Sequence, residues 1–312
     1  MKETKQTNRF ALCFFLYYIA ASIVLARIPA TSALPEGVSM IVFQMICFLP
    51  PIVFYFLLTK KSVKQTLRLQ PLGLKNTLIL IPFSFAIQPL MSFLSYVTGL
   101  FFPNPVEESM AALQSSGFLL SLVAVAVLPA IFEETSMRGI VLSGYHRLGT
   151  WSKAFACALL FGLMHMNLQQ FPYAFFVGFI FCFLVERTGS IYASILPHFI
   201  INATSVWAAF ANVEAAEMAE EASHLTTFLA VSFMAVSSLP ILAGLLYLFL
   251  RENPPRPDPP MAVPESIEED VTEPLPEPEV TGTLIKDWLL SPSILTIFLL
   301  YAIFGVLPYL IM

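Results

Sequence analysis

The chain has 312 residues, of which 57% are hydrophobic and only 12% are charged. Soluble domains average about 45–50% apolar and about 25% charged residues, so this composition, with a mean hydropathy of +0.76, excludes an ordinary soluble fold. The net charge of -5 comes mostly from two acidic stretches, 214–221 and 252–279. It gives no indication of a nucleic-acid partner, and we expect one membrane domain followed by a tail.

Nine apolar segments are candidates for helices that cross a hydrocarbon core, which takes about 17–25 residues. They are 10–26, 38–58, 77–102, 118–145, 152–166, 171–185, 191–210, 226–250 and 289–312. The first follows basic residues as a signal peptide does, but it is long and lacks a clean cleavage site, so we expect it to remain as a helix. The pattern predicts an all-α polytopic membrane protein of eight to nine transmembrane helices.

The loops between these segments differ strongly in charge. With the N-terminus inside, the inner loops hold 14 of the 16 Lys and Arg residues, and such residues concentrate on the cytoplasmic side of membranes. The exceptions are Arg27, at the outer end of the first span, and Arg138, inside the fourth. We therefore predict a multi-pass protein of the cell membrane with a cytoplasmic N-terminus and an external C-terminus.

The apolar segments also divide the chain. We predict N-terminal transmembrane helices in 1–117, catalytic helices in 118–211, an outer loop and a further helix in 212–250, a linker in 251–286 and a C-terminal helix in 287–312. The linker is rich in Pro and Glu and is expected to be disordered. The acidic loop 212–224 is expected to be a solvated surface or a short helix outside the membrane. The four cysteines lie in apolar runs without paired spacing, so no disulfide is expected.

Charged side chains are rare inside the predicted spans. A charge at the centre of a membrane helix costs about 2.5–3.5 kcal/mol on insertion scales, so such residues usually serve a function. The candidates lie on the fourth, fifth and seventh spans, roughly 11–20 Å from the inner boundary at about 1.5 Å per residue. They are Glu133, Glu134, Arg138, His165, His198 and Asn202. Three helices are thus expected to bring polar groups to a similar depth, around a central polar cavity.

Helical spacing sorts these candidates. Residues four apart share one face, which groups Glu134 with Arg138 and His198 with Asn202. Glu133 and Glu134 point about 100° apart, so one can face the cavity while the other forms a buried pair with Arg138. A carboxylate and an imidazole can together deprotonate water, and His and Asn side chains can donate hydrogen bonds to an oxyanion. Hydrolysis of an amide fits these groups without a cofactor.

Prolines and isolated amides complete the polar pattern of the spans. Pro129 and Pro197 precede the two key stretches, and a proline inside a helix leaves a backbone carbonyl without its usual donor. A membrane helix tolerates this where a neighbour or a cavity satisfies the carbonyl. Gln44, Gln88 and Asn76 are expected only to form hydrogen bonds between helices.

Three short motifs connect these residues to a known family. Residues 133–138 read EETSMR and fit EExxxR, residues 161–165 read FGLMH and fit FxxxH, and residues 198–202 read HFIIN and fit HxxxN. In this order, on polytopic helices, they resemble the CPBP family, also called the Abi or CAAX-protease-like family, which includes the CAAX prenyl endopeptidases. The resemblance covers 133–202 and implies a metal-independent intramembrane protease of the glutamic type. It implies that Glu133 and His165 activate water while His198 and Asn202 form the oxyanion hole.

Other functions remain open at this point. Glu133, His165 and His198 could form a zinc site with two histidines and one carboxylate, although the chain has no HExxH motif. A membrane scaffold or an immunity-type binding protein could carry the same motifs without catalysis. A transporter is also conceivable, but no inverted repeat is visible. If the protein is a peptidase, a site at this depth in the lipid bilayer favours a membrane-anchored protein or a hydrophobic peptide as substrate.

Overall fold

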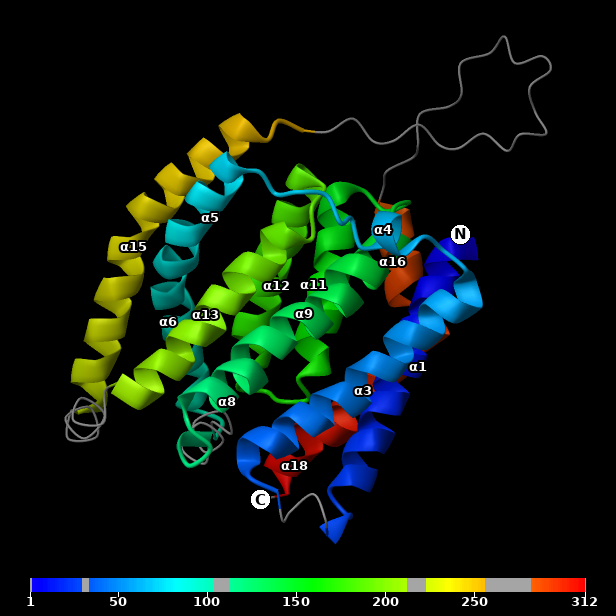
Figure 1. Cartoon of the computed structure of the whole chain (residues 1–312), viewed down its shortest axis with the longest axis horizontal. Coiled ribbons are helices and arrows are strands. Elements are labelled where there is room, and N and C mark those ends of the chain that lie inside the picture. The colour runs from blue at the N-terminus through cyan, green and yellow to red at the C-terminus, as the bar shows by residue number, and fades with distance from the viewer. Residues whose placement is uncertain (1, 30–33, 104–112, 212–222, 256–281, 312) are drawn as a thin grey trace.

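The computed structural model describes residues 2–29, 34–103, 113–211, 223–255 and 282–311. The structure is 83% helical, and these residues contain no strand. The predicted all-α class is therefore confirmed. Figure 1 shows the helices lying side by side in one bundle.

Among the described residues, eight helices are long and apolar enough to cross a membrane. Several consist of consecutive shorter elements that continue one another, so that the fourth span, 118–144, contains five. In chain order, the first three spans are α1 (Lys2–Leu25), α3 (Glu36–Thr59) and the pair of α5 (Leu74–Ala86) with α6 (Gln88–Gly99). The fourth span consists of α8 (Phe118–Leu122), η1 (Val123–Val127), α9 (Leu128–Glu134), η2 (Thr135–Val141) and α10 (Leu142–Gly144). The last four spans are α12 (Phe171–Thr188), α13 (Tyr192–Ala211), α15 (His224–Glu252) and the run of α17 (Pro292–Tyr301), η3 (Ala302–Val306) and α18 (Leu307–Leu310).

The described parts of the chain contain three further, shorter helices. They are α4 (Val63–Thr66), α11 (Thr150–Met164) and α16 (Gly282–Leu289). Apolar α11 takes the place of the fifth predicted span. The chain is a multi-pass membrane protein, as predicted, and its outer surface agrees, because large apolar side chains such as Leu58 and Phe233 are 80% and 74% exposed. Lipid is the solvent that such a surface requires.

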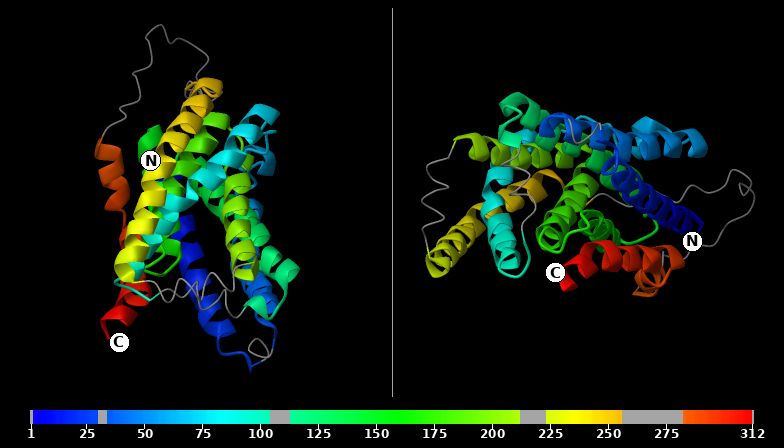
Figure 2. Two further views of the ribbon diagram at one scale, coloured as in Figure 1. Left: turned by 90° about the vertical axis from the view of Figure 1, so that its left-hand side faces the viewer. Right: turned by 90° about the horizontal axis from the view of Figure 1, so that it is seen from below.

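The helices that carry the candidate residues, together with α12, lie at the centre of the bundle. Helices α11 and α12 pack against each other, and α13 packs against α5, η1, α9 and α12. Figures 1 and 2 show α5, α6 and α15 on one side of this centre and α1, α3 and the C-terminal helices on the other. The central position of α9, α12 and α13 removes their polar groups from lipid.

One end of the bundle is closed by an ion cluster. Arg68 lies in the segment between α4 and α5, and its Nη1 is 2.6 Å from Glu186 Oε1 near the end of α12. Lys153, at the start of α11, contacts the other oxygen of Glu186. In the same region the Ser190 hydroxyl donates to Gln70 O. These contacts fasten the segment that follows α4 to α11 and α12, at the end where α4, α16 and the start of α5 lie (Figure 1).

The structure differs from the predicted spans in local details. Helix α11 ends at Met164 rather than at 166, because Met166 adopts a left-handed backbone with φ 48°. Two π-helical segments, η1 and η2, flank α9; such segments are rare and are frequent at functional sites. Helix α16 begins at Gly282, within the predicted linker.

The isolated amides act as expected. The side-chain amide of Gln44 donates to Ala124 O, that of Gln88 donates to Thr204, and Asn76 exchanges hydrogen bonds with Asn253. Residues 212–222 of the predicted acidic loop and 256–281 of the predicted linker lie outside the described residues. The division of the chain into five segments remains a prediction.

Candidate active site

A single large cavity brings the predicted catalytic residues together. It has a volume of about 1070 Å³ and is lined by Glu133, His165, His198 and Asn202, among others. These side chains come from α9, from the turn after α11 and from α13, so three separate stretches converge as predicted. Because drug-sized ligand pockets have volumes of about 300–1,000 Å³, the cavity has room for a short peptide.

The two adjacent glutamates have different surroundings. The Glu134 side chain is fully buried, and its Oε1 accepts a hydrogen bond of 3.0 Å from Arg138 Nη1. The Glu133 side chain is 18% exposed and lines the cavity. Successive helical residues point about 100° apart, which is why one carboxylate reaches the cavity and the other does not. Glu133 thus faces the cavity, while Glu134 forms a buried pair with Arg138.

Arg138 is held on several sides. Its Nη2 donates to Gly178 O of α12 at 3.1 Å, and its guanidinium carbon lies 4.3 Å from the ring centre of Phe161 and 5.4 Å from that of Phe181. A guanidinium over aromatic faces gains cation–π stabilisation, which is largest where water is excluded. Arg138 therefore joins η2, α11 and α12 while it compensates the charge of Glu134.

His198 connects this buried pair to the cavity. Its Nδ1 lies 2.7 Å from Glu134 Oε1, and its Nε2 lies 4.0 Å from Glu133 Oε2. Glu134 is an ionised acceptor because it is paired with Arg138, so the hydrogen of this short contact belongs to His198 Nδ1. The second nitrogen of the ring is then directed toward Glu133. Sequence spacing did not identify Glu134 as the partner of His198, since this contact depends on how α13 packs against α9.

Asn202 is oriented by a backbone carbonyl that the helix leaves free. Its Nδ2 donates to Val125 O at 2.9 Å, and Val125 lies in the π-helical segment η1, four residues before Pro129. Pro129 has no N–H with which to bond that carbonyl. The side chain of Asn202 takes the place of the missing donor, and an amide nitrogen still has a second hydrogen for another acceptor.

His165 follows the last residue of α11 and also lines the cavity. Its Nδ1 lies 2.8 Å from Phe161 O, one turn earlier. A carbonyl oxygen only accepts, so Nδ1 donates and the remaining ring nitrogen is Nε2. The ring of Phe161 packs at 88° against that of His165, with centres 5.0 Å apart. Phe161 thus contacts both His165 and Arg138.

Two residues near the site were not identified from the sequence. Gly178 brings its carbonyl within reach of Arg138, and a Cβ at this position would lie 2.9 Å from the ring of Phe161 and 3.2 Å from Arg138 Nη2. Phe181 packs against the guanidinium of Arg138 and against the ring of His198. A single glycine or phenylalanine within an apolar helix carries no sequence signal of its own. Their spacing, with Phe181 three residues after Gly178, only indicates a shared face.

The donors needed for a metal site do not converge in the part of the chain that the structure describes. No group of three His, Cys, Asp or Glu side chains there is arranged to hold a metal ion. Glu133, His165 and His198 line the same cavity, but the structure does not group them as a ligand set. The zinc hypothesis therefore gains no support from their geometry.

Comparison with known proteins adds an independent finding. Residues 115–204 match the family model described as "Type II CAAX prenyl endopeptidase Rce1-like". No curated protein and no solved structure matches the chain. The matched residues include all six candidate side chains and the three motifs on which the resemblance was based. The central part of this multi-pass membrane protein is thus similar to the CAAX-protease-like family of membrane proteases.

Proposed function

We propose that this protein is an intramembrane endopeptidase of the glutamic type, which hydrolyses a peptide bond of a membrane-anchored protein or hydrophobic peptide. The observation that carries the proposal is the convergence of Glu133, His165, His198 and Asn202 on one cavity inside a membrane bundle. The family match supports a protease of this class. We further propose that it resides in the cell membrane with its N-terminus in the cytoplasm.

Glu133 is the proposed general base. The 4.0 Å between Glu133 Oε2 and His198 Nε2 is too long for a direct hydrogen bond, and it suits a water molecule bound between the two groups. Glu133, with His165 as its partner, takes a proton from this water while the oxygen adds to the substrate carbonyl. The proton then passes to the leaving amine as the C–N bond breaks.

His198 and Asn202 are the proposed donors to the oxyanion. The His198 ring lies between the carboxylates of Glu133 and Glu134, and its Nε2 faces the cavity, where it donates to the oxyanion when it carries a proton. Asn202 is fixed through Val125 O and contributes its second amide hydrogen. Fixed donors directed at a developing oxyanion commonly supply the largest part of the rate enhancement in acyl transfer. Glu134 and Arg138 are supporting residues that orient His198.

Comparative terminal proteomics of membranes that carry the wild type or Glu133→Gln tests the proposal. Glu36→Gln is the matched control, because Glu36 is exposed at the start of α3, away from the cavity. We expect new peptide ends with the wild type and with Glu36→Gln, and their loss with Glu133→Gln. This design does not presuppose a prenylated substrate. Identical peptide ends in all three membranes would contradict catalysis and favour a scaffold or an immunity-type binding protein.

A second measurement separates the glutamic mechanism from zinc catalysis. Proteolysis in the same membranes should persist after exhaustive chelation, because the proposed groups activate water without a metal. Loss of the new peptide ends after chelation, with recovery on adding zinc, would favour the metalloprotease instead.

A further inference from the structure

The cavity occupies one end of the bundle only. The ion cluster of Arg68, Glu186 and Lys153 marks the other end. On each helix that lines the cavity, the lining residues lie in the half farther from this cluster, or no more than about one turn past the middle of the helix. On α3 they run from Met40 to Phe48 of Glu36–Thr59, and on the span of α5 and α6 they begin only at Gln88. The catalytic groups are thus at the bottom of the cavity, near the middle of the membrane.

Among the residues that the structure describes, the far end of the cavity reaches the surface at the helix ends. Gly99 and Leu100 at the end of α6 and His224 at the start of α15 line it and are exposed, with Leu100 exposed by 50%. A polar stripe leads inward from this mouth along α6. Gln88, Ser92, Ser95 and Gly99 have helical spacings of four, three and four, and all line the cavity.

The opposite end is closed. Between the catalytic groups and the ion cluster, many side chains of η2, α10, α11, α12 and the beginning of α13 are fully or almost fully buried. They include Met137, Ile140, Val141, Leu142, Ala154, Cys157, Cys182, Leu184, Val185, Ile191, Ala193 and Ser194. A passage from that end to Glu133 would require these side chains to separate.

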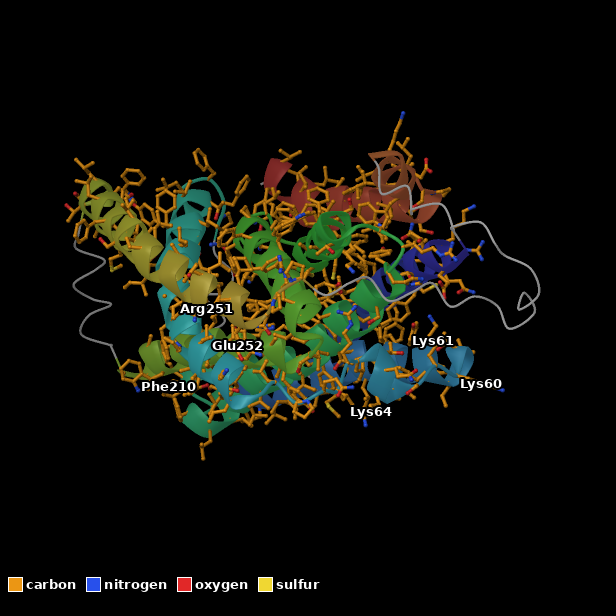
Figure 3. The ribbon with its side chains drawn as sticks, turned by 90° about the horizontal axis from the view of Figure 1, so that it is seen from above. Lys60, Lys61, Lys64, Phe210, Arg251 and Glu252 are labelled. Carbon is orange, nitrogen blue, oxygen red and sulfur yellow. The ribbon has the colours of Figure 1, made fainter. Side chains whose placement is uncertain are left out.

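The basic residues mark the closed end. The described Lys and Arg residues at this end are Lys5, Arg9, Lys60, Lys61, Lys64, Arg68, Lys75, Arg147, Lys153, Arg187, Arg251 and Lys286, whereas Arg27 lies at the end of α1 on the other side. Figure 3 views the protein from the basic end, with Lys60, Lys61, Lys64 and Arg251 labelled. Because Lys and Arg concentrate on the cytoplasmic side, the closed end faces the cytoplasm.

We propose that the cavity opens to the extracytoplasmic side, so that the scissile bond of the substrate lies in the outer half of the bilayer or just outside it. The substrate class is a membrane-anchored peptide that approaches from the outer leaflet. The polar stripe of α6 forms hydrogen bonds with water or with the backbone groups of this peptide, which lipid cannot provide. The identity of the reaction rests on the proposed function. The side from which the cavity opens does not depend on it.

Accessibility of single cysteines to a charged, membrane-impermeant methanethiosulfonate tests the opening. Cys47, Cys157 and Cys182 are buried and Cys13 is exposed, so Cys13→Ala serves as the background. Leu100→Cys reports the mouth, Ser205→Cys reports the cavity wall three residues beyond Asn202, and Lys64→Cys reports the basic end. Each is labelled in sealed vesicles of right-side-out and of inverted orientation.

We expect Leu100→Cys and Ser205→Cys to react only in right-side-out vesicles and Lys64→Cys only in inverted ones. Reaction of Ser205→Cys from the same face as Lys64→Cys would overturn the proposal, and so would a Ser205→Cys that reacts from neither face. The same labelling in a Glu133→Gln background should be unchanged. A failure of catalysis is thereby distinguished from a failure of the proposed opening.

The cleavage sites give a second measurement. Peptide ends that depend on Glu133 should map to the outer half of substrate spans or to adjacent external segments. Ends in cytoplasmic segments would contradict the opening while they support proteolysis.

Discussion

Two glutamates, the buried Glu134 and the half-buried Glu186, are each paired with two basic groups, yet their surroundings have little else in common. Glu134 contacts Arg138 and His198 beside the cavity. Glu186 contacts Arg68 and Lys153 at the basic end, and none of these three lines the cavity. The side chains of Glu134 and Arg138 are fully buried, whereas the side chain of Arg68 in the second cluster is 21% exposed.

The difference lies in the kind of partner. Glu186 is held between two permanent charges, which fixes helix ends to one another. Glu134 has one permanent charge and one imidazole, and the imidazole has a second nitrogen for the cavity. A buried charge in a membrane protein therefore indicates a reactive site only when a titratable partner leads from it to a space that a substrate can occupy.

The largest expected effect is that of Arg138→Met. Removal of one partner leaves the charge of Glu134 uncompensated, and breaking a buried pair costs about 3–5 kcal/mol. We expect a much lower thermal stability in detergent micelles, together with loss of proteolysis as His198 loses its orientation. Arg187→Met is the control, because the Arg187 guanidinium lies over Phe183 near the basic end. Equal stability of the two variants would show that the Glu134 pair contributes little to the fold.

Asn202→Ala should reduce activity more than stability. Loss of one oxyanion donor lowers kcat by about 10²–10³, while the hydrogen bond to Val125 O contributes only about 0.5–1.5 kcal/mol to stability. The control is Asn76→Ala, which removes an amide that bonds Asn253 at the basic end and should leave kcat/KM unchanged. Similar kinetics for the two variants would argue against Asn202 as a donor.

Glu186→Gln tests the other cluster. The change removes the charge that Arg68 and Lys153 share, and we expect a loss of about 1.5–3 kcal/mol, as for hydrogen bonds to charged groups. The kcat/KM of the folded fraction should remain that of the wild type. A lower kcat/KM at undiminished stability would show that the ion cluster influences the cavity.

The spans and the different surroundings of Glu133 and Glu134 could be predicted from the sequence, because a membrane restricts the structures that a chain can adopt. Backbone groups in lipid must bond within a helix, so apolar length alone located the spans. The 100° step between Glu133 and Glu134 and the spacing to Arg138 are local, and they predicted which carboxylate is buried. The contact of His198 with Glu134 joins residues 64 positions apart, and no local pattern specifies it. The π-helical segments and the end of α11 at Met164 are backbone details that hydropathy does not report.

Gly178→Ala is the smallest change that distinguishes the two clusters. Arg138 reaches the backbone of α12 directly, and a methyl group at Gly178 would press on Phe161 at 2.9 Å and on Arg138 at 3.2 Å. Overpacking of this kind costs about 1–3 kcal/mol, and displacement of Arg138 should also lower kcat/KM. The control is Gly244→Ala in α15, where an added Cβ meets nothing within 4 Å and better helix propensity should compensate any loss. If Gly178→Ala retained the kcat/KM of Gly244→Ala, the position of Arg138 would tolerate movement.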